Sequence, residues 1–211
     1  MTDFEPRKWP KQARSKASFA AILEAAAQLL RDGDHEALTT NHIAARAGVS
    51  IGTLYEFFGS KEAIIAVLAA ERMKRLHEAM IKGMGEAALL GPWRGVSHML
   101  DVAVSSVAAD REVLQKLLRQ ISFVPHLPAV VAAQADMMAL AEQVRIGAGD
   151  AIDLPQPEVD TWLISQMLYN AILEIAFLDA DEKRRAELTK ELARLTYRMA
   201  VGRDPEETPD R

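Results

Sequence analysis

Residues 39–61, TTNHIAARAGVSIGTLYEFFGSK, constrain the fold more than any other stretch of this 211-residue chain. Thr40 is expected to cap a short helix, and Gly48 supplies the left-handed backbone conformation that ends a helix at little cost. Ser50 follows as the cap of a second helix, because its hydroxyl can accept a hydrogen bond from an amide of the first turn. Leu54 returns to the core and helps to set the angle between the two helices. The spacing therefore predicts a helix-turn-helix whose second helix projects from the surface.

The rest of the chain also follows a helical pattern. Residue types that favour helices dominate it, and no alternating β-branched run between hairpin turns is present. Short clusters of glycine and proline separate the apolar periodic stretches and indicate loops. We therefore predict an all-α fold with an N-terminal three-helix domain, which contains the helix-turn-helix, and a C-terminal helical domain. The expected helices cover residues 15–31, 41–47, 51–57, 61–82, 93–109, 111–123, 129–146, 157–178 and 181–201.

The net charge of −5 is unevenly distributed. Residues 1–62 hold eight Lys or Arg and eight Asp or Glu, so the acidity belongs to residues 63–211. Residues 7–16 carry five basic residues and no acidic one, and this basic arm is expected either to follow a DNA backbone or minor groove or to be a solvated tail. We divide the chain into the arm and helix-turn-helix domain at 1–62, a helical domain at 63–202 and a disordered tail at 203–211.

Composition excludes several classes of protein. The absence of cysteine excludes disulfides, thiolate zinc sites and cysteine nucleophiles. The five histidines never pair at helical spacing, so we expect no metal site, and no cofactor is expected. No segment approaches the roughly 18 apolar residues that a bilayer span needs, and the N-terminus lacks the apolar core of a signal peptide. We expect a cytoplasmic protein without a membrane partner.

Two local patterns admit other interpretations. Residues 48–52 match G-x-S-x-G, which in α/β-hydrolases places a nucleophilic serine between a strand and a helix. An alanine-rich helical run precedes Gly48, so a helical hydrolase is kept only as an alternative and no catalytic residue is assigned. Residues 83–88 imitate a dinucleotide fingerprint, but no strand precedes them, and a helix that ends near Lys82 is the better interpretation.

Residues 22–68 resemble the N-terminal domain of TetR-family transcriptional regulators. The resemblance is carried by the alanine-rich first helix, the TT pair, the run IAARAGVSIGTLYEFF and the SK that follows. It implies a homodimer, a palindromic operator of double-stranded DNA, and a small-molecule effector that releases a repressor from that operator. A helical enzyme and an interaction protein without DNA affinity are the competing functional classes.

The resemblance assigns DNA contacts to seven positions of this chain. Residues at the start of the second helix are expected to reach base edges, and the others to contact phosphates through hydroxyls, a lysine or helix N-termini. Capping alone and bare solvent exposure are the alternatives for the phosphate contacts. The seven residues are Thr40, Ser50, Ile51, Gly52, Thr53, Tyr55 and Lys61.

Two neighbouring positions depart from the family pattern. Phe57 stands where a tyrosine or histidine commonly reaches a phosphate, so one backbone contact is expected to be missing or replaced by packing. Glu56 places a carboxylate on the recognition helix, where it either accepts a hydrogen bond from cytosine N4 or points into solvent.

The last two expected helices carry apolar faces that need partners. Residues 159–177 present two largely apolar faces, and residues 188–199 present one apolar seam opposite a charged face. We expect both helices to pair with their symmetry mates in a four-helix dimer interface, with completion of a monomeric core as the alternative.

An effector pocket is expected among apolar residues that have a few polar handles. Ordinary core is the alternative for each of them, and their composition favours only an apolar or aromatic compound. The helix expected at 61–82 joins the two domains and is the predicted transmitter. The pocket candidates are Trp93, His98, Phe123, Met137, Trp162, Gln166, Tyr169 and Asn170, with Met99, His126 and Met138 beside them.

Overall fold

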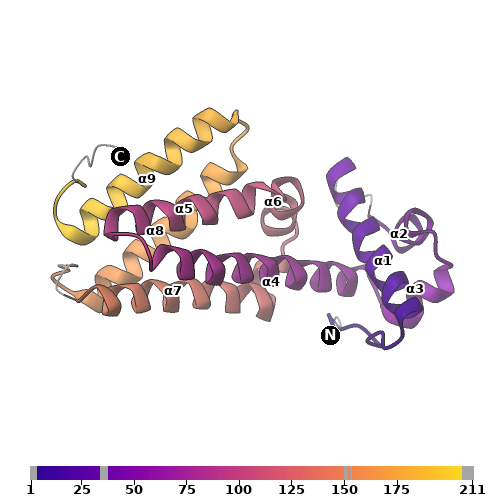
Figure 1. Ribbon diagram of the computed structural model, residues 1–211. Helices are drawn as coiled ribbons and strands as arrows, with labels where there is room; N and C mark the ends of the chain where they lie inside the picture. Colours follow the sequence, from indigo (N-terminus) through magenta and orange to yellow (C-terminus); the bar gives the residue numbers. More distant parts are fainter. Residues whose placement is uncertain (1–3, 34–37, 150–151, 153, 206–211) are drawn as a thin grey trace. The chain divides into compact units, whose positions relative to one another are not determined.

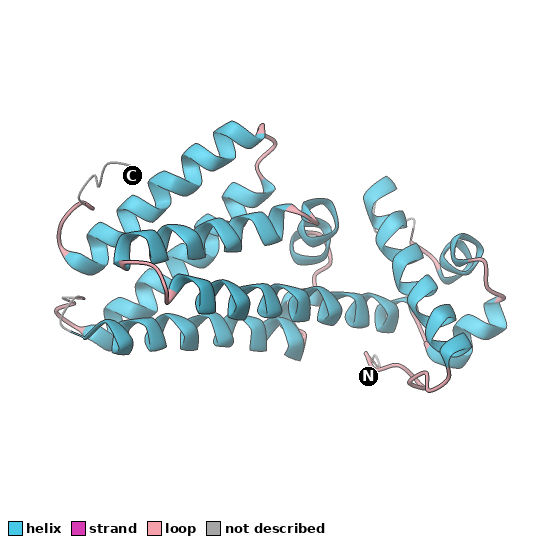
Figure 2. Ribbon diagram, in the orientation of Figure 1, coloured by secondary structure: helices cyan, strands magenta, loops and turns pink. Residues whose placement is uncertain are grey.

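The computed structural model describes residues 4–33, 38–149, 152 and 154–205, which form helices joined by connecting loops (Figure 1). These described residues contain no strand, as Figure 2 shows, so the predicted all-α fold is confirmed. The helices are α1 (Ala13–Asp32), α2 (Thr40–Ala47), α3 (Ile51–Phe57), α4 (Lys61–Ala87), α5 (Pro92–Ala108), α6 (Arg111–Arg119), the 3-10 turn η2 (Val124–His126), α7 (Pro128–Ala148), α8 (Pro157–Phe177) and α9 (Glu182–Val201).

The chain divides into two compact units. The N-terminal unit comprises Met1–Lys74 and Glu112–Val131, and the C-terminal unit comprises Arg75–Arg111 and Ala132–Arg211. This division differs from the one predicted at the start of α4, because the buried apolar run at residues 63–69 belongs to the N-terminal unit. The continuous helix α4 therefore contributes residues to both units.

The predicted tail is only partly described. Residues 206–211 lie outside the described residues. Asp204, by contrast, forms ion pairs with Arg194 (2.5 Å) and Arg198 (3.6 Å) of α9. The tail predicted to begin at residue 203 is therefore attached to the last helix in its described part.

Apolar side chains of α1, α2 and α3 hold the start of the N-terminal unit together. Phe19, Ile22 and Leu30 of α1 are buried, and α1 packs against both α2 and α3. The ring of Phe19 stacks on that of Phe58 with 4.8 Å between centroids, and it meets the ring of Phe57 edge-on at 5.6 Å. Burying one large apolar side chain stabilises a fold by about 1.5–3 kcal/mol, so these rings fix the short helix α3 on α1.

A lysine of α6 satisfies the C-terminal end of α1. Nζ of Lys116 donates hydrogen bonds to the carbonyl oxygens of Leu30, Arg31 (3.2 Å) and Gly33 (2.7 Å). The last carbonyls of a helix have no partner within the helix and carry partial negative charge, so an ammonium group stabilises them. This interaction attaches α6 to the rest of the N-terminal unit.

The helix α6 ends earlier than predicted. It ends at Arg119 rather than near Phe123, and the separate turn η2 begins at Val124. Pro125 in η2 lacks an amide donor, so a continuous α-helix cannot run through this segment without losing a hydrogen bond.

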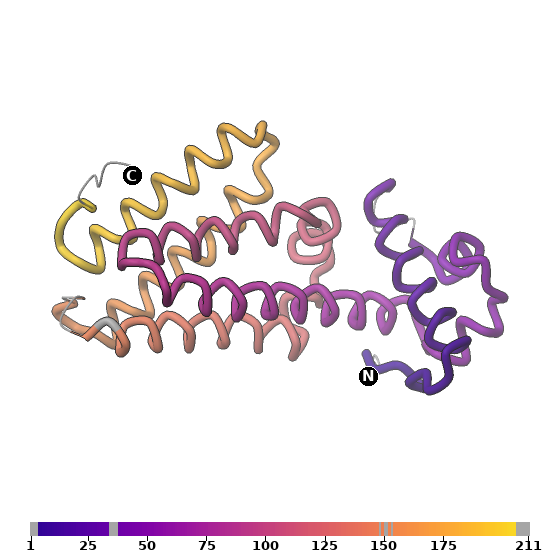
Figure 3. The backbone as a smooth tube through the Cα atoms, in the orientation of Figure 1, coloured from indigo at the N-terminus to yellow at the C-terminus, as the bar shows by residue number. Residues whose placement is uncertain are grey.

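In the C-terminal unit, α5 packs against both α8 and α9, which also pack against each other. Figure 3 shows the chain reversing between α4 and α5 and again between α8 and α9. A contact between His77 Nδ1 and Asp136 Oδ2, 3.2 Å apart, joins α4 to α7. Among the described helices, none combines the length and the apolarity that a membrane crossing requires.

The predicted end of the fourth helix near Lys82 is wrong. The helix continues through Gly83 and Gly85 and ends at Ala87. Gly83 is buried, and a Cβ at this position would lie only 3.0 Å from Cγ1 of Val102 in α5. Close packing of α4 against α5, rather than helix termination, therefore requires this glycine.

The helix α9 turns small residues inward and large apolar residues outward. Thr189, Ala193 and Thr196 are buried. Leu195 and Met199, which lie on the seam identified in the sequence, are 43% and 38% exposed. Leu188 and Leu192 of the same seam are half-buried, so the single chain leaves the C-terminal half of the seam exposed.

The helix α8 also leaves large apolar side chains exposed over part of its length. Ser165, Ile172 and Ala176 are buried, and they lie on one of the two predicted faces. Leu163 and Met167 are 47% and 57% exposed. The C-terminal part of α8 is therefore covered within the chain, whereas apolar side chains nearer its N-terminal end face solvent.

Candidate nucleic-acid interface and effector region

Two caps and one glycine build the turn between α2 and α3. Thr39 Oγ1 accepts a hydrogen bond from an amide in the first turn of α2 (3.2 Å), so the cap predicted at Thr40 is wrong by one residue. Gly48 follows α2 with φ of 66°, in the left-handed conformation that was predicted. Ser50 Oγ accepts a hydrogen bond from the Thr53 amide (3.0 Å) and caps α3.

The helix α3 turns opposite faces to the core and to solvent. Leu54 and Phe57 are 0% and 3% exposed, whereas Ile51 and Tyr55 are 39% and 40% exposed. Gly52 is also exposed and adds no side chain to the outer surface. A projecting helix with this profile can approach the floor of a major groove, which is about 12 Å wide.

Four of the seven predicted DNA-contacting residues are paired through their hydroxyls. Thr40 Oγ1 lies 3.2 Å from the hydroxyl of Tyr55, which joins α2 to α3. Ser50 Oγ lies 2.9 Å from Thr53 Oγ1 at the start of α3. A hydroxyl has one donor and two acceptor positions, so each pair keeps capacity for a further hydrogen bond. Because Thr39 caps α2, the Thr40 hydroxyl is not needed as a cap.

Lys61 begins α4 directly after the serine that caps this helix. Ser60 Oγ accepts a hydrogen bond from the Ala63 amide (3.2 Å). Lys61 itself is half-buried. The N-terminal ends of α2, α3 and α4 thus carry Thr40, Ser50 and Lys61, and helix N-termini favour bound anions through their free amides and dipole.

The two departures from the family pattern have different surroundings. Phe57 is buried against Phe19, so packing occupies the position where a polar tip was expected. Glu56 is exposed on the outer surface of α3. The helix therefore presents a carboxylate, and no cationic side chain of its own, to solvent.

The start of the basic arm is folded onto the N-terminal unit. Arg7 donates its backbone amide to the carbonyl of Phe57 (2.7 Å) and its Nη1 to the carbonyl of Tyr55 (3.3 Å). Phe4 and Trp9 flank Arg7 in the sequence. The ring of Phe4 stacks on that of Phe123, and the ring of Trp9 packs at a tilt against that of Phe19. These contacts do not follow from the sequence, because charge alone does not show which backbone carbonyls an arginine meets.

The G-x-S-x-G match has a helical setting. Ser50 is preceded by α2 and followed by α3, so no strand feeds the turn in which it lies. Its hydroxyl is engaged by the Thr53 amide and hydroxyl. The strained strand-to-helix turn that exposes a hydrolase nucleophile is therefore not formed around Ser50.

Two predicted effector residues of α8 each contact a residue of α7. Gln134 Nε2 donates to the hydroxyl of Tyr169 (2.9 Å), and Gln166 Nε2 lies 3.5 Å from Sδ of Met138. Asn170 is exposed and donates its Nδ2 to the carbonyl of Gln166 (2.8 Å). Partly buried amides and a phenol beside a thioether provide the mixed polar and apolar surface that small-molecule sites use.

Two further candidates lie on α5. The ring of Trp93 meets that of Tyr197 in α9 edge-on, with 5.8 Å between centroids. His98 Nε2 lies 2.9 Å from Glu86 Oε2 of α4. Partial burial raises the pKa of Asp101, and the charge of the nearby His98 opposes that shift. These interactions join α5 to its neighbours.

The remaining candidates do not share one location. Phe123 belongs to the N-terminal unit, where its ring stacks on Phe4 at 4.9 Å between centroids. Met137 is half-buried on α7, and Trp162 is 51% exposed on α8. Within the part of the chain that the structure describes, no group of three or more potential ligand side chains is arranged to hold a metal ion.

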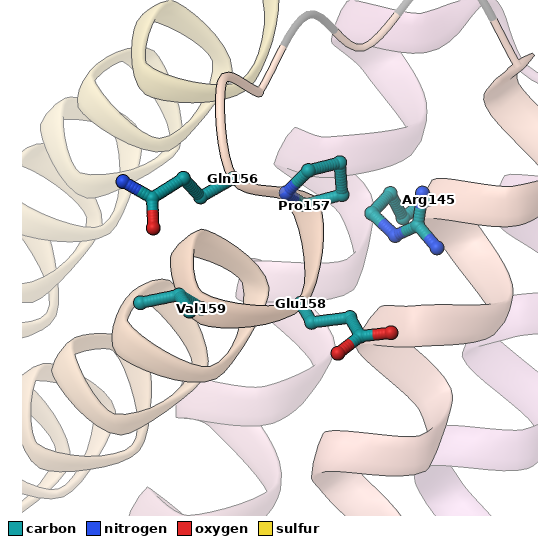
Figure 4. Close-up of a pocket in the computed structure, with 5 residues that line it drawn as sticks. All are labelled: Arg145, Gln156, Pro157, Glu158 and Val159. Atoms are coloured by element: carbon teal, nitrogen blue, oxygen red, sulfur yellow. The ribbon is translucent and has the colours of Figure 1, made fainter.

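A surface pocket of about 400 Å³ lies between the end of α7 and the start of α8 (Figure 4). None of the eight predicted effector residues lines it. Arg145 forms an ion pair with Glu142 (2.5 Å), and hydrogen bonding by that arginine lowers the pKa of the glutamate. The lining residues are Arg145, Gln156, Pro157, Glu158 and Val159.

Comparison with protein families identifies the N-terminal region. Residues 22–68 match the family described as bacterial regulatory proteins, tetR family. The "Fatty acid metabolism regulator protein" of Bacillus subtilis is 33% identical over 78 residues, which cover 37% of this chain and 39% of that protein. An uncharacterized HTH-type transcriptional regulator of Mycobacterium tuberculosis is 35% identical over 75 residues, which cover 35% of this chain and 37% of that protein. The chain thus matches less than two-fifths of the length of these curated relatives.

Solved structures resemble the chain over most of its length. The fatty acid degradation regulator FadR from Bacillus halodurans has a TM-score of 0.69 at 18% identity, covering 90% of this chain and 97% of that one. NalD of Pseudomonas aeruginosa, described as the secondary repressor of the MexAB-OprM multidrug efflux pump, has a TM-score of 0.64 at 19% identity, covering 89% and 98%. At these identities the resemblance shows a common fold.

Proposed function

The chain belongs to the TetR family of bacterial regulatory proteins, and on this premise we propose that it is a transcriptional repressor. Its proposed target is a palindromic operator in double-stranded DNA, which it binds as a homodimer. A small-molecule effector releases it from that operator.

The observation that carries the DNA-binding part of the proposal is the hydroxyl pair of Thr40 and Tyr55. Thr39 already satisfies the capping requirement of α2, so the Thr40 hydroxyl has no capping task. Tyr55 lies on the exposed side of the recognition helix. A threonine and a tyrosine hydroxyl that hold each other at such a surface are suited to clamp one phosphate, while Ile51, Gly52 and Thr53 approach the bases.

The outward apolar faces of α8 and α9 support the homodimer. Leu163 and Met167 of α8 and Leu195 and Met199 of α9 each remain more than a third exposed in the single chain. Two helices from each subunit, related by a twofold axis, can bury these side chains in a four-helix interface. In the proposed dimer the recognition helices lie about 34 Å apart, one turn of DNA.

Release by an effector follows from a change in the spacing of the recognition helices. The helix α4 is the proposed transmitter, because it is continuous between residues of the two units. The contact of α7 and α8 around Tyr169 and Gln166 is the proposed effector region, and its surface favours an apolar compound with a polar end. The names of two relatives, which regulate fatty acid metabolism or degradation, favour the same chemical class. A differential affinity of about 1–3 kcal/mol gives a 5- to 150-fold response.

Selection of DNA by the purified protein tests the proposal. A pool of random duplexes should converge on an inverted repeat whose half-sites are centred about 10 base pairs apart. A parallel selection with a known helix-turn-helix protein is the control. If that selection enriches its site while the pool selected by this protein stays random, sequence-specific DNA binding is refuted.

The effector is tested with straight-chain fatty acids and planar aromatic acids. An effector should raise the melting temperature and weaken binding of the selected duplex about 5- to 150-fold. A compound that saturates the protein but leaves duplex affinity unchanged contradicts release by that compound.

A further inference from the structure

Arg7, near the N-terminus of the chain, forms hydrogen bonds with the C-terminal turn of the recognition helix α3. The backbone amide of Arg7 donates to the carbonyl of Phe57 (2.7 Å), and its guanidinium donates to the carbonyl of Tyr55 (3.3 Å). Carbonyl oxygens in the last turn of a helix accept no hydrogen bond from an amide of the same helix, and they carry partial negative charge. Arg7 therefore supplies both a hydrogen-bonding partner and a positive charge where α3 needs them.

Gly59 leaves room for the side chain of this arginine. A Cβ added to Gly59 would lie 3.2 Å from Nε of Arg7, which is closer than an ordinary van der Waals contact. Gly59 thus leaves space for the guanidinium beside the connection from α3 to α4.

Two aromatic contacts fix the segment that carries Arg7. The ring of Phe4 stacks on Phe123 at 4.9 Å, and the ring of Trp9 lies 5.6 Å from that of Phe19. We call residues 4–10 the strap. Because the strap is anchored on both sides of Arg7, its arginine is held at α3 instead of projecting freely from the chain.

We propose that Arg7 is a positioning residue for DNA recognition: it sets the C-terminal turn of α3, and through that turn the placement of the Tyr55 side chain, without itself contacting DNA. The inference rests on the proposed function. It differs from the expectation for the basic arm, in which Arg7 would lie against a phosphate or in a minor groove.

Hydrogen exchange in the DNA-free protein tests the structural half of this proposal. Replacing Arg7 with glutamine (R7Q) should speed exchange of amides in the last turn of α3, among them the Phe58 amide that donates to Leu54 (2.9 Å), by roughly three- to ten-fold. Exchange in α5 should stay unchanged, and R7K should restore part of the protection. The matched control is K8Q, which removes an exposed charge from the next position and should leave α3 unchanged. Equal exchange of α3 in R7Q and the wild-type protein would overturn the proposal.

Binding of the duplex selected by the wild-type protein tests the functional half. R7Q should weaken binding about five- to ten-fold with an unchanged slope of log affinity against log salt, because the protein still neutralises the same phosphates. The loss should be smaller when Tyr55 is already phenylalanine, since Arg7 acts through that side chain. A lower salt slope in R7Q, or losses that simply add in the double variant, would overturn the positioning role. If the wild-type protein selects no duplex, the proposed function fails, and hydrogen exchange still decides whether Arg7 sets α3.

Discussion

Two adjacent threonines have different roles in this chain. Thr39 accepts a hydrogen bond from an amide of α2, while Thr40 places its hydroxyl 3.2 Å from that of Tyr55. The sequence predicted a capped helix here but assigned the cap to Thr40 instead of Thr39, because both threonines stand side by side before the helical run. The exact first residue of a helix depends on backbone angles that residue type alone does not determine.

Substitution of each threonine separates stability from DNA binding. T39A should lower stability by about 1 kcal/mol, which corresponds to roughly 2–4 °C in melting temperature, because α2 is left without its cap. T40V should leave the melting temperature nearly unchanged and weaken duplex binding several-fold. Thermal unfolding and duplex titration of both variants check this, and an equal decrease of melting temperature in the two would contradict the division of roles.

At the scale of elements, most helices follow from local pattern, and the error at the end of α4 follows from a tertiary contact. The helix predicted at residues 51–57 is α3, because a serine cap precedes it, a glycine ends the helix before it, and two core positions lie within it. The end predicted near Lys82 is wrong because glycine was interpreted as a helix terminator. Gly83 is instead packed against Val102, a residue of the next helix that no local pattern connects to it.

Two glycines of α4 should respond oppositely to alanine. G85A has no atom of another residue within 4 Å of the new Cβ, so the variant should gain up to about 1 kcal/mol from the better helix propensity of alanine. G83A places its Cβ 3.0 Å from Val102 and should lose stability, because overpacking costs about 1–3 kcal/mol and exceeds that gain. Denaturant unfolding of both variants measures the difference. Stabilisation of G83A to the level of G85A would show that α4 and α5 are not closely packed there.

At the scale of the whole molecule, the sequence narrows the DNA-contacting candidates to one short segment but does not do so for the effector candidates. The seven DNA-contacting candidates lie between Thr40 and Lys61, where a single motif sets their spacing. The effector candidates were chosen by residue type, and core residues have the same types. Phe123 illustrates the difficulty, since it packs on Phe4 in the N-terminal unit.

The proposed dimer predicts that the exposed Leu195 lies in the interface between the subunits. Leu195 is 43% exposed on the seam of α9, and in a twofold interface each substitution removes it from both subunits. L195E should raise the dimer dissociation constant by at least about a hundredfold, because burying each leucine contributes about 1.5–3 kcal/mol. L89E is the control, since Leu89 is 88% exposed in the connection between α4 and α5. Sedimentation equilibrium that finds both variants dimeric would place the interface elsewhere.

We propose that the surface around α3 reads a specific DNA sequence and is secured by phosphate contacts. The most direct test is an anisotropy titration of the selected duplex and a scrambled duplex over a range of salt concentrations, with the wild-type protein, Y55F and K61A. We expect the wild-type protein to bind the selected duplex at least about 10³-fold more tightly than the scrambled one, and both variants to bind it more weakly. For K61A we also expect a salt slope reduced by about 0.9 for each phosphate that Lys61 neutralises in the wild-type complex. Equal affinity of the wild-type protein for the two duplexes would contradict sequence-specific recognition by this surface.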